Sequence, residues 1–127
     1  MKLRIRGDSI RLRLTRGEVE RIGAGETVAE TTRLGAGTVF EYRLVPDAAA
    51  QIPAAVLRAA VLEIRLPRAQ ARAWALGDEV GISASQPVDA GATLDLLVEK
   101  DFACLAPRPG EDESDMYEHP EAGSSRC

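Results

Sequence analysis

An internal repeat limits the folds open to this chain. At an offset of 52 residues, one set of positions aligns with its counterpart later in the chain: Leu12, Leu14, Gly25, Glu26 and Val28 with Ile64, Leu66, Gly77, Asp78 and Val80. A two-residue slip, placed in the hairpin, aligns the next set: Phe40, Tyr42, Leu44 and Asp47 with Leu94, Leu96, Val98 and Asp101. A unit of about 50 residues cannot cover its own apolar face. The repeat therefore predicts two halves that complete one core.

The first half predicts strand, helix, strand and strand. Residues 2–15 alternate aliphatic and arginine side chains, which places them on opposite faces of a sheet. Gly7-Asp8-Ser9 interrupts this run, so it forms either two strands or one bulged strand. Thr15 and Glu18 match a capping box and predict a helix with Val19 and Ile22 facing inward. Strands are expected at residues 27–34 and 39–45, joined at Gly35-Ala36-Gly37.

The second half predicts the same order of elements. Residues 61–66 alternate as a strand, Pro67 suits a helix start, and Gly77 ends the helix. Trp74 on this helix is expected in the core, with a stacking platform for a ligand as the alternative. Strands are expected at residues 79–85 and 93–100, with a turn at 88–91. Residues 48–60 are expected to be a linker with one helical turn, because residues 54–60 favour a helix.

These elements predict an α+β fold, mainly antiparallel β, in which two strand–helix–strand–strand repeats close a small barrel. Such closure removes free strand edges. Residues 1–106 would form a single duplicated β-rich domain with halves at about 1–47 and 61–101, linked by 48–60. Residues 107–127 would form an acidic C-terminal tail.

Two resemblances add to this interpretation. The run Ile64-Arg65-Leu66-Pro67, a short helix and then Leu76-Gly77-Asp78-Glu79-Val80-Gly81-Ile82 partially resembles the AbrB/MazE-like swapped-hairpin half-barrels, in which two halves interleave. The first half has Thr15 where that pattern has proline. The whole chain resembles a family of small uncharacterised bacterial proteins that open with Met-Lys-x-Arg-Ile-Arg and close with Glu-Asp-Glu-Ser-Asp. That resemblance implies no known activity.

The charge is unevenly distributed along the chain. The net charge of −4 arises entirely from residues 107–127, because residues 1–106 balance. Residues 1–21 are basic, and the tail is either solvated or folds back on these strands. An AbrB-like DNA-binding regulator would contact phosphates through Arg4, Arg6, Arg11, Arg13 and Arg16. Carboxylates such as Glu30, Glu41 or Glu63 paired with arginines across strands would instead favour a structural role.

The tail carries the other candidate site residues. Met116 and Tyr117, with Asp112 and Asp115, are candidate contacts to a protein partner. Cys104, His119 and Cys127 are candidate metal ligands, although 14 residues separate the first two. A Cys104–Cys127 disulfide and two free thiols are the alternatives.

The composition and motifs favour binding over catalysis. The chain contains one histidine, His119, and has no nucleophile elbow or phosphate-binding glycine loop. No apolar run approaches a membrane span, and the N-terminus lacks the apolar region of a signal peptide, so a cytoplasmic location is expected. We therefore expect a non-catalytic binding or accessory module without a cofactor, whose partner is another protein. Nucleic-acid binding and metal binding are the alternatives.

Overall fold

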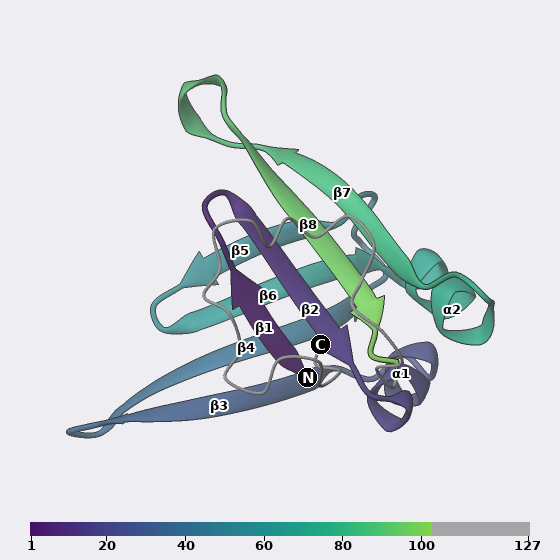
Figure 1. The fold of residues 1–127 in the computed structure, drawn as a ribbon, viewed down its shortest axis with the longest axis horizontal. Helices are drawn as coiled ribbons and strands as arrows, with labels where there is room; N and C mark the ends of the chain where they lie inside the picture. Colours follow the sequence, from purple (N-terminus) through teal and green to yellow (C-terminus); the bar gives the residue numbers. More distant parts are fainter. Residues whose placement is uncertain (103–127) are drawn as a thin grey trace, which may run out of the picture.

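The computed structural model describes residues 1–102. They form eight strands, two α-helices and one short 3-10 helix (Figure 1). In chain order these are β1 (Lys2–Ile5), β2 (Ser9–Leu14), α1 (Arg16–Gly23), β3 (Val28–Gly35), β4 (Thr38–Asp47), β5 (Ala54–Arg58), β6 (Val61–Pro67), α2 (Arg68–Leu76), β7 (Gly81–Pro87), η1 (Asp89–Gly91) and β8 (Thr93–Lys100). The chain is thus mainly β with some helix.

The strands form two four-stranded sheets. Sheet A has the order β1-β2-β8-β7, and sheet B has the order β3-β4-β6-β5. Each outer pair is an antiparallel hairpin, whereas the central pairs β2–β8 and β4–β6 are parallel. Figure 1 shows the sheets as two crossed layers with both helices at the same end.

The two halves of the chain interleave. Each sheet takes one hairpin from residues 1–47 and one from residues 54–100. The central pairings are equivalent, because Leu12 pairs with Val98 in sheet A and Ile64 pairs with Leu44 in sheet B. Each half therefore supplies the strands that the other half lacks.

The expected position of the two-residue slip is wrong. Val28 pairs with Leu44, and Ile82 pairs with Val98, so the offset is already 54 at the start of the third strand of each half. The extra residues therefore lie between α2 and β7 rather than in the hairpin. Val80, the expected counterpart of buried Val28, is exposed and precedes β7.

The expected closed barrel is also wrong. Strand β1 does not form a hydrogen-bonded pair with β3, and β5 does not form one with β7. At the β5–β7 seam, the Gln86 side chain accepts a hydrogen bond from the Ala55 amide (2.7 Å) and donates one to the Ala55 carbonyl (3.2 Å). At the other seam, the Met1 amine contacts Glu30 of β3. Side chains and the N-terminus thus occupy the places where strand hydrogen bonds would close a barrel.

The segment 48–60 differs from the expected linker. Residues 54–58 form β5, and no helical turn is present there. Ala55 pairs with Ile64, as Leu3 pairs with Leu12 in the first half. Each half is consequently strand, strand, helix, strand and strand, with one strand more than the sequence indicated for the second half.

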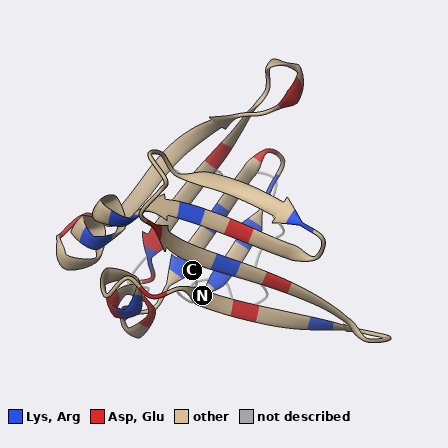
Figure 2. Ribbon diagram, turned by 180° about the vertical axis from the view of Figure 1, so that it is seen from behind, with Lys and Arg blue, Asp and Glu red and all other residues tan. Residues whose placement is uncertain are grey.

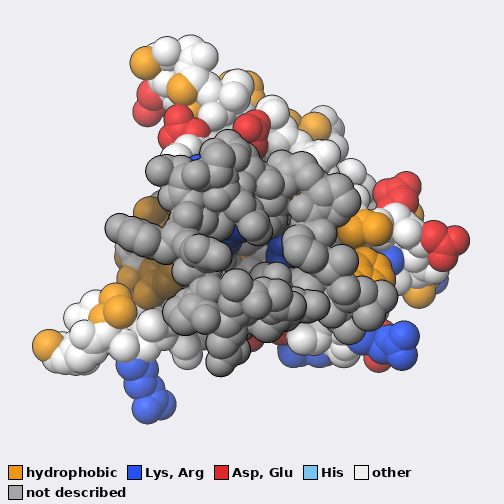
Figure 3. All heavy atoms as spheres, in the orientation of Figure 1, with side chains coloured by type: hydrophobic (Ala, Val, Ile, Leu, Met, Phe, Trp, Pro, Cys, Tyr) orange, Lys and Arg blue, Asp and Glu red, His pale blue; other side chains and the backbone are white. Residues whose placement is uncertain are grey.

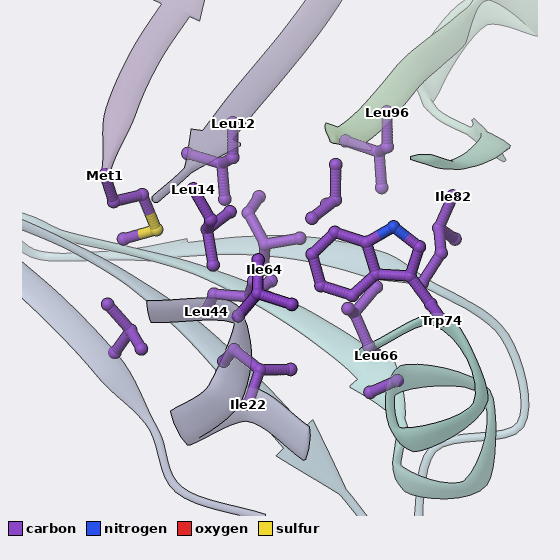
Figure 4. Close-up of a cluster of buried hydrophobic side chains, with 14 of the residues drawn as sticks. Met1, Leu12, Leu14, Ile22, Leu44, Ile64, Leu66, Trp74, Ile82 and Leu96 are labelled. Carbon is purple, nitrogen blue, oxygen red and sulfur yellow. The ribbon is translucent and has the colours of Figure 1, made fainter. Parts of the chain in front are cut away.

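The core lies between the sheets and against the helices (Figure 4). Val19 and Ile22 of α1 are buried, as predicted, and their counterparts on α2 are Ala71 and Trp74. Trp74 is 1% exposed and donates from Nε1 to the Val80 carbonyl (3.2 Å). Trp74 is therefore a core residue and does not present its ring as a stacking platform.

Helix α1 begins with the predicted capping box. The Glu18 amide donates to the Thr15 hydroxyl, and a Glu18 carboxylate oxygen accepts from the Thr15 amide (2.9 Å). Neither of the described helices is long and apolar enough to cross a membrane.

Candidate functional site: the open end and the basic face

Apolar side chains reach solvent at the end of the sandwich farthest from the helices. We call this surface the open end and define it by Ile5, Phe40, Leu57 and Leu94. Ile5 is the last residue of β1 and is 58% exposed, and Leu57 of β5 is 64% exposed. Both lie beside hairpin turns that Figure 1 shows on the side away from α1 and α2. Phe40 and Leu94 are half-buried and pack against the core next to these turns.

The pairing of strands explains why apolar residues gather there. Ile5 pairs with buried Ile10, and Leu57 pairs with buried Leu62. Alternation places Ile5 and Leu57 on the inner faces of their sheets. Because the sheets cross and do not close, these inner faces come to the surface at the ends of the strands. Figure 3 shows hydrophobic side chains along this edge of the molecule and out to the β3–β4 tip.

The predicted arginines lie mostly on the outer face of sheet A. Lys2 pairs with Arg13, and Arg4 pairs with Arg11, so four cations sit side by side on the β1–β2 hairpin. We call these four residues the basic row. Arg6 follows β1 in the turn, whereas Arg16 lies at the start of α1, away from this row.

Carboxylates pair with only part of the basic row. Glu99 of β8 lies 2.7 Å from Arg13 Nε and 3.8 Å from Arg11 Nε. Lys2 Nζ lies 3.3 Å from Asp101. Within residues 1–102, neither Arg4 nor Arg6 forms an ion pair. Arg11 and Arg13 thus have a structural partner, and the row retains an excess of positive charge.

Sheet B is balanced more closely. Arg43 pairs with Glu41 on β4, and Arg65 pairs with Glu63 on β6 (2.5 Å). Figure 2 shows positive and negative residues alternating along these two strands. The hydrogen bond from Arg65 to Glu63 raises the pKa of the Arg65 guanidinium. Glu41 and Glu63 therefore pair with arginines of their own strands and not with the basic row.

A depression of about 510 Å³ lies on sheet A beside Arg11 and is lined by both polar and apolar side chains. Ser85 of β7 lines it and donates a hydrogen bond to Asp95 of β8 (2.9 Å). Ser9 and Ser83 also line it. Activation of a serine nucleophile needs a base within reach, most often a histidine. Within residues 1–102 these hydroxyls have a neighbouring carboxylate, Asp95, and no histidine.

A charged cluster encloses the N-terminal amine at the β1–β3 seam. The Met1 amine lies 2.6 Å from Glu18 Oε2 and 2.7 Å from Glu30 Oε1. The Tyr42 hydroxyl lies 2.8 Å from Glu30 Oε2 and 2.9 Å from the Met1 carbonyl oxygen, both acceptors. From the sequence, Glu18 was expected only to cap the helix. The contacts between residues 1, 18, 30 and 42 could not be predicted from local sequence patterns, because these residues are far apart in the chain.

The pKa values of this cluster follow from burial and pairing. Burial lowers the pKa of the Met1 amine, but hydrogen bonds to Glu18 and Glu30 outweigh it and the net shift is upward. Burial raises the pKa of Glu18, and bonds to Met1 and Thr15 reverse this to a net lowering. The hydrogen bond from Met1 lowers the pKa of Glu30. Burial, together with the bond to Glu30, raises the pKa of Tyr42 to about 12.

The tail candidates lie outside the described residues. These are the partner-contact residues Asp112, Asp115, Met116 and Tyr117 and the metal-ligand candidates Cys104, His119 and Cys127. Their roles stay predictions. Among residues 1–102 no group of three or more potential metal ligands comes together.

The family comparison covers both halves and most of the tail. A family model described as a family of unknown function, DUF7009, matches residues 1–121. The chain belongs to this family. The resemblance to an uncharacterised family is thereby confirmed. Searches of curated proteins and of solved structures give no match.

Proposed function

We propose that this protein is a non-catalytic binding module that holds another protein at its open end. The supporting observation is the exposure of Ile5 and Leu57 at equivalent places in the two halves, backed by half-buried Phe40 and Leu94. Isolated exposed aliphatic residues are common, but apolar residues grouped on one surface mark interaction sites. Apolar anchors surrounded by other packed side chains supply most of the energy of an interface.

The pairing of charges supports a protein partner over DNA. Phosphate contacts provide most of the affinity of a nucleic-acid binder. Glu99 offsets Arg11 and Arg13, and Asp101 offsets Lys2, which weakens the field that a phosphate backbone would meet. The partial AbrB resemblance keeps DNA as the second candidate, because Arg4 and the rest of the basic row lie together on one face.

The open end is tested with a double substitution and a matched control. Ile5→Asp with Leu57→Asp removes both exposed anchors, whereas Leu76→Asp alters an equally exposed leucine at the end of α2. Cross-linking in an extract identifies the partner, and calorimetry with purified partner measures affinity. Loss of two anchors should cost about 2 kcal/mol or more, roughly a thirty-fold weaker Kd. Equal binding by all three proteins would refute the proposal.

The DNA candidate has a separate test. A mobility-shift assay on random duplex at low salt, with the full chain and with residues 107–127 removed, detects phosphate-driven binding. A shift that disappears with added salt and with Arg4→Ala would favour the DNA-binding function. No shift in either protein would exclude it.

A further inference from the structure

The basic row lies on a sheet face that no described element covers. Both helices pack at one end of the sandwich, and sheet B covers only the inner face of sheet A. Like charges directly opposite each other on paired strands destabilise a sheet. Lys2–Arg13 and Arg4–Arg11 are two such pairs in succession. The row therefore favours an anionic occupant.

Arg11 shows where such an occupant is needed. Its Nη1 nitrogen is buried and has no hydrogen-bond partner among residues 1–102. Its Nε atom lies 3.8 Å from Glu99, a carboxylate that bonds Arg13 more closely. A buried guanidinium nitrogen without an acceptor costs free energy. A further carboxylate at this position would satisfy it.

The position at which the chain leaves β8 brings its own acidic segment to this face. The Asp101 amide donates to the Leu14 carbonyl (2.8 Å), and the Asp101 carboxylate pairs with Lys2. Residue 102 therefore lies at the end of the strands that carry the basic row. The eight residues 103–110 can span up to roughly 26 Å. The strands β8, β2 and β1 extend over only about 10 Å between the outer two.

We propose that the acidic segment 111–121 of this chain docks on the basic row of sheet A. This segment holds Glu111, Asp112, Glu113, Asp115, Glu118 and Glu121 and has no lysine or arginine. Its carboxylates complement Arg4, which forms no ion pair within residues 1–102, and Arg11, whose contact with Glu99 is long at 3.8 Å. Met116 and Tyr117 interrupt the acidic run and add apolar contact area. The surface is distinct from the open end and does not depend on the proposed function.

The docking is tested in the full-length chain with a spin label inside the acidic run. A nitroxide is attached at position 114 of a Ser114→Cys variant in which Cys104→Ser and Cys127→Ser remove the other thiols. The label should cause loss of amide peak intensity in β1 and β2, while the peaks of β5 and β6 keep theirs. Raising the salt concentration should restore the lost peaks, because exposed charges are screened.

Matched arginine variants distinguish docking on the basic row from a non-specific attraction of the acidic segment to any positive surface. Arg4→Ala with Arg11→Ala should abolish the loss of intensity in β1 and β2. Arg43→Ala with Arg65→Ala, on sheet B, should leave it unchanged. Equal loss on both sheets, or a loss that survives the first pair of substitutions, would overturn the proposal. The proposal would also be overturned if the label left the peaks of β1 and β2 unchanged and random DNA duplex shifted them. That result would assign the basic row to nucleic-acid binding.

Discussion

At the scale of single residues, the Met1 amine joins two carboxylates that lie far from it in the sequence. It forms ion pairs with Glu18 and Glu30, and Glu18 also caps α1. Because Tyr42 donates to this group of acceptors, one cluster joins the N-terminus to α1, β3 and β4. The cluster therefore fixes the entry of the chain into sheet A.

The pKa shifts give the cluster a defined pH window. The Met1 amine has a raised pKa in the folded state, so its stabilisation is complete below its usual value of 8.0 and is lost as pH rises through the folded value. Glu18 and Glu30 have lowered pKa values, so their stabilisation is present above 4.5 and is lost as pH falls through the folded values. We expect denaturation midpoints to be highest between these limits and to decline on both sides.

Chemical blocking of the amine should remove the alkaline side of this dependence. Acetylation of the Met1 amine abolishes the charge and should lower the free energy of unfolding by about 1–2 kcal/mol, because hydrogen bonds to charged groups are involved. Glu18→Gln keeps a capping side chain at the same helix position but loses the charge, and should behave similarly. Glu20→Gln, on the exposed side of α1, is the control. Urea unfolding at several pH values measures all of them, and identical curves would contradict the assigned role.

At the scale of elements, the two helices pack closely against each other. A Cβ atom built on Gly23 would lie 2.9 Å from the Cβ of Ala75, its counterpart at the repeat offset of 52. The helices thus meet close to the axis that relates the two halves. Real Cβ atoms essentially never come this close, so any larger residue at position 23 must push the helices apart.

Alanine substitutions on α1 should therefore have opposite effects at two glycines. Gly23→Ala should lower stability by about 1–3 kcal/mol through overpacking. Gly17→Ala, where nothing lies within 4 Å, should raise it by about 0.5–1 kcal/mol because alanine favours helix. Adding Ala75→Gly to Gly23→Ala should recover part of the loss. Thermal unfolding measures the stability of each variant. Stabilisation by Gly23→Ala would show that the helices are not in close contact.

The seam at β5 depends on one side chain. Gln86 satisfies both backbone groups of Ala55, which another strand would otherwise do. Gln86→Ala should cost about 1–2 kcal/mol and should speed hydrogen exchange at the Ala55 amide. Gln70→Ala, at an exposed position of α2, should have little effect. Unchanged exchange at Ala55 in the Gln86 variant would contradict the contact.

The elements that the sequence predicted are those with local signals. Thr15 and Glu18 marked the start of α1, and the spacing of Val19 and Ile22 identified its inner face. Alternation located β2 and β6. By contrast, the alanines at positions 54 and 55 favour helix, and only pairing with β6 and the contact with Gln86 make this segment a strand. Tertiary contacts overrode propensity there.

At the scale of the whole molecule, the sequence predicted the duplication but not whether the outer strands of the two sheets pair with each other. Equivalent apolar positions, such as Leu12 and Ile64, revealed the shared core, because burial on one face imposes the same period in each half. Barrel closure was not predictable, since it depends on whether β1 meets β3 and β5 meets β7 across the core. The open end is a consequence of that missing closure, and no local pattern distinguishes Ile5 from a buried strand residue.

The most direct test of the interleaved fold is to divide the chain after Ala50, in the turn that follows β4. Each fragment then holds one half, and each sheet needs hairpins from both. Amide chemical-shift dispersion, measured together with the mass in solution, reports folding of each fragment and of their mixture. We expect that neither fragment folds as a monomer and that mixing them restores the native spectrum. A single fragment that folds alone as a monomer would contradict it.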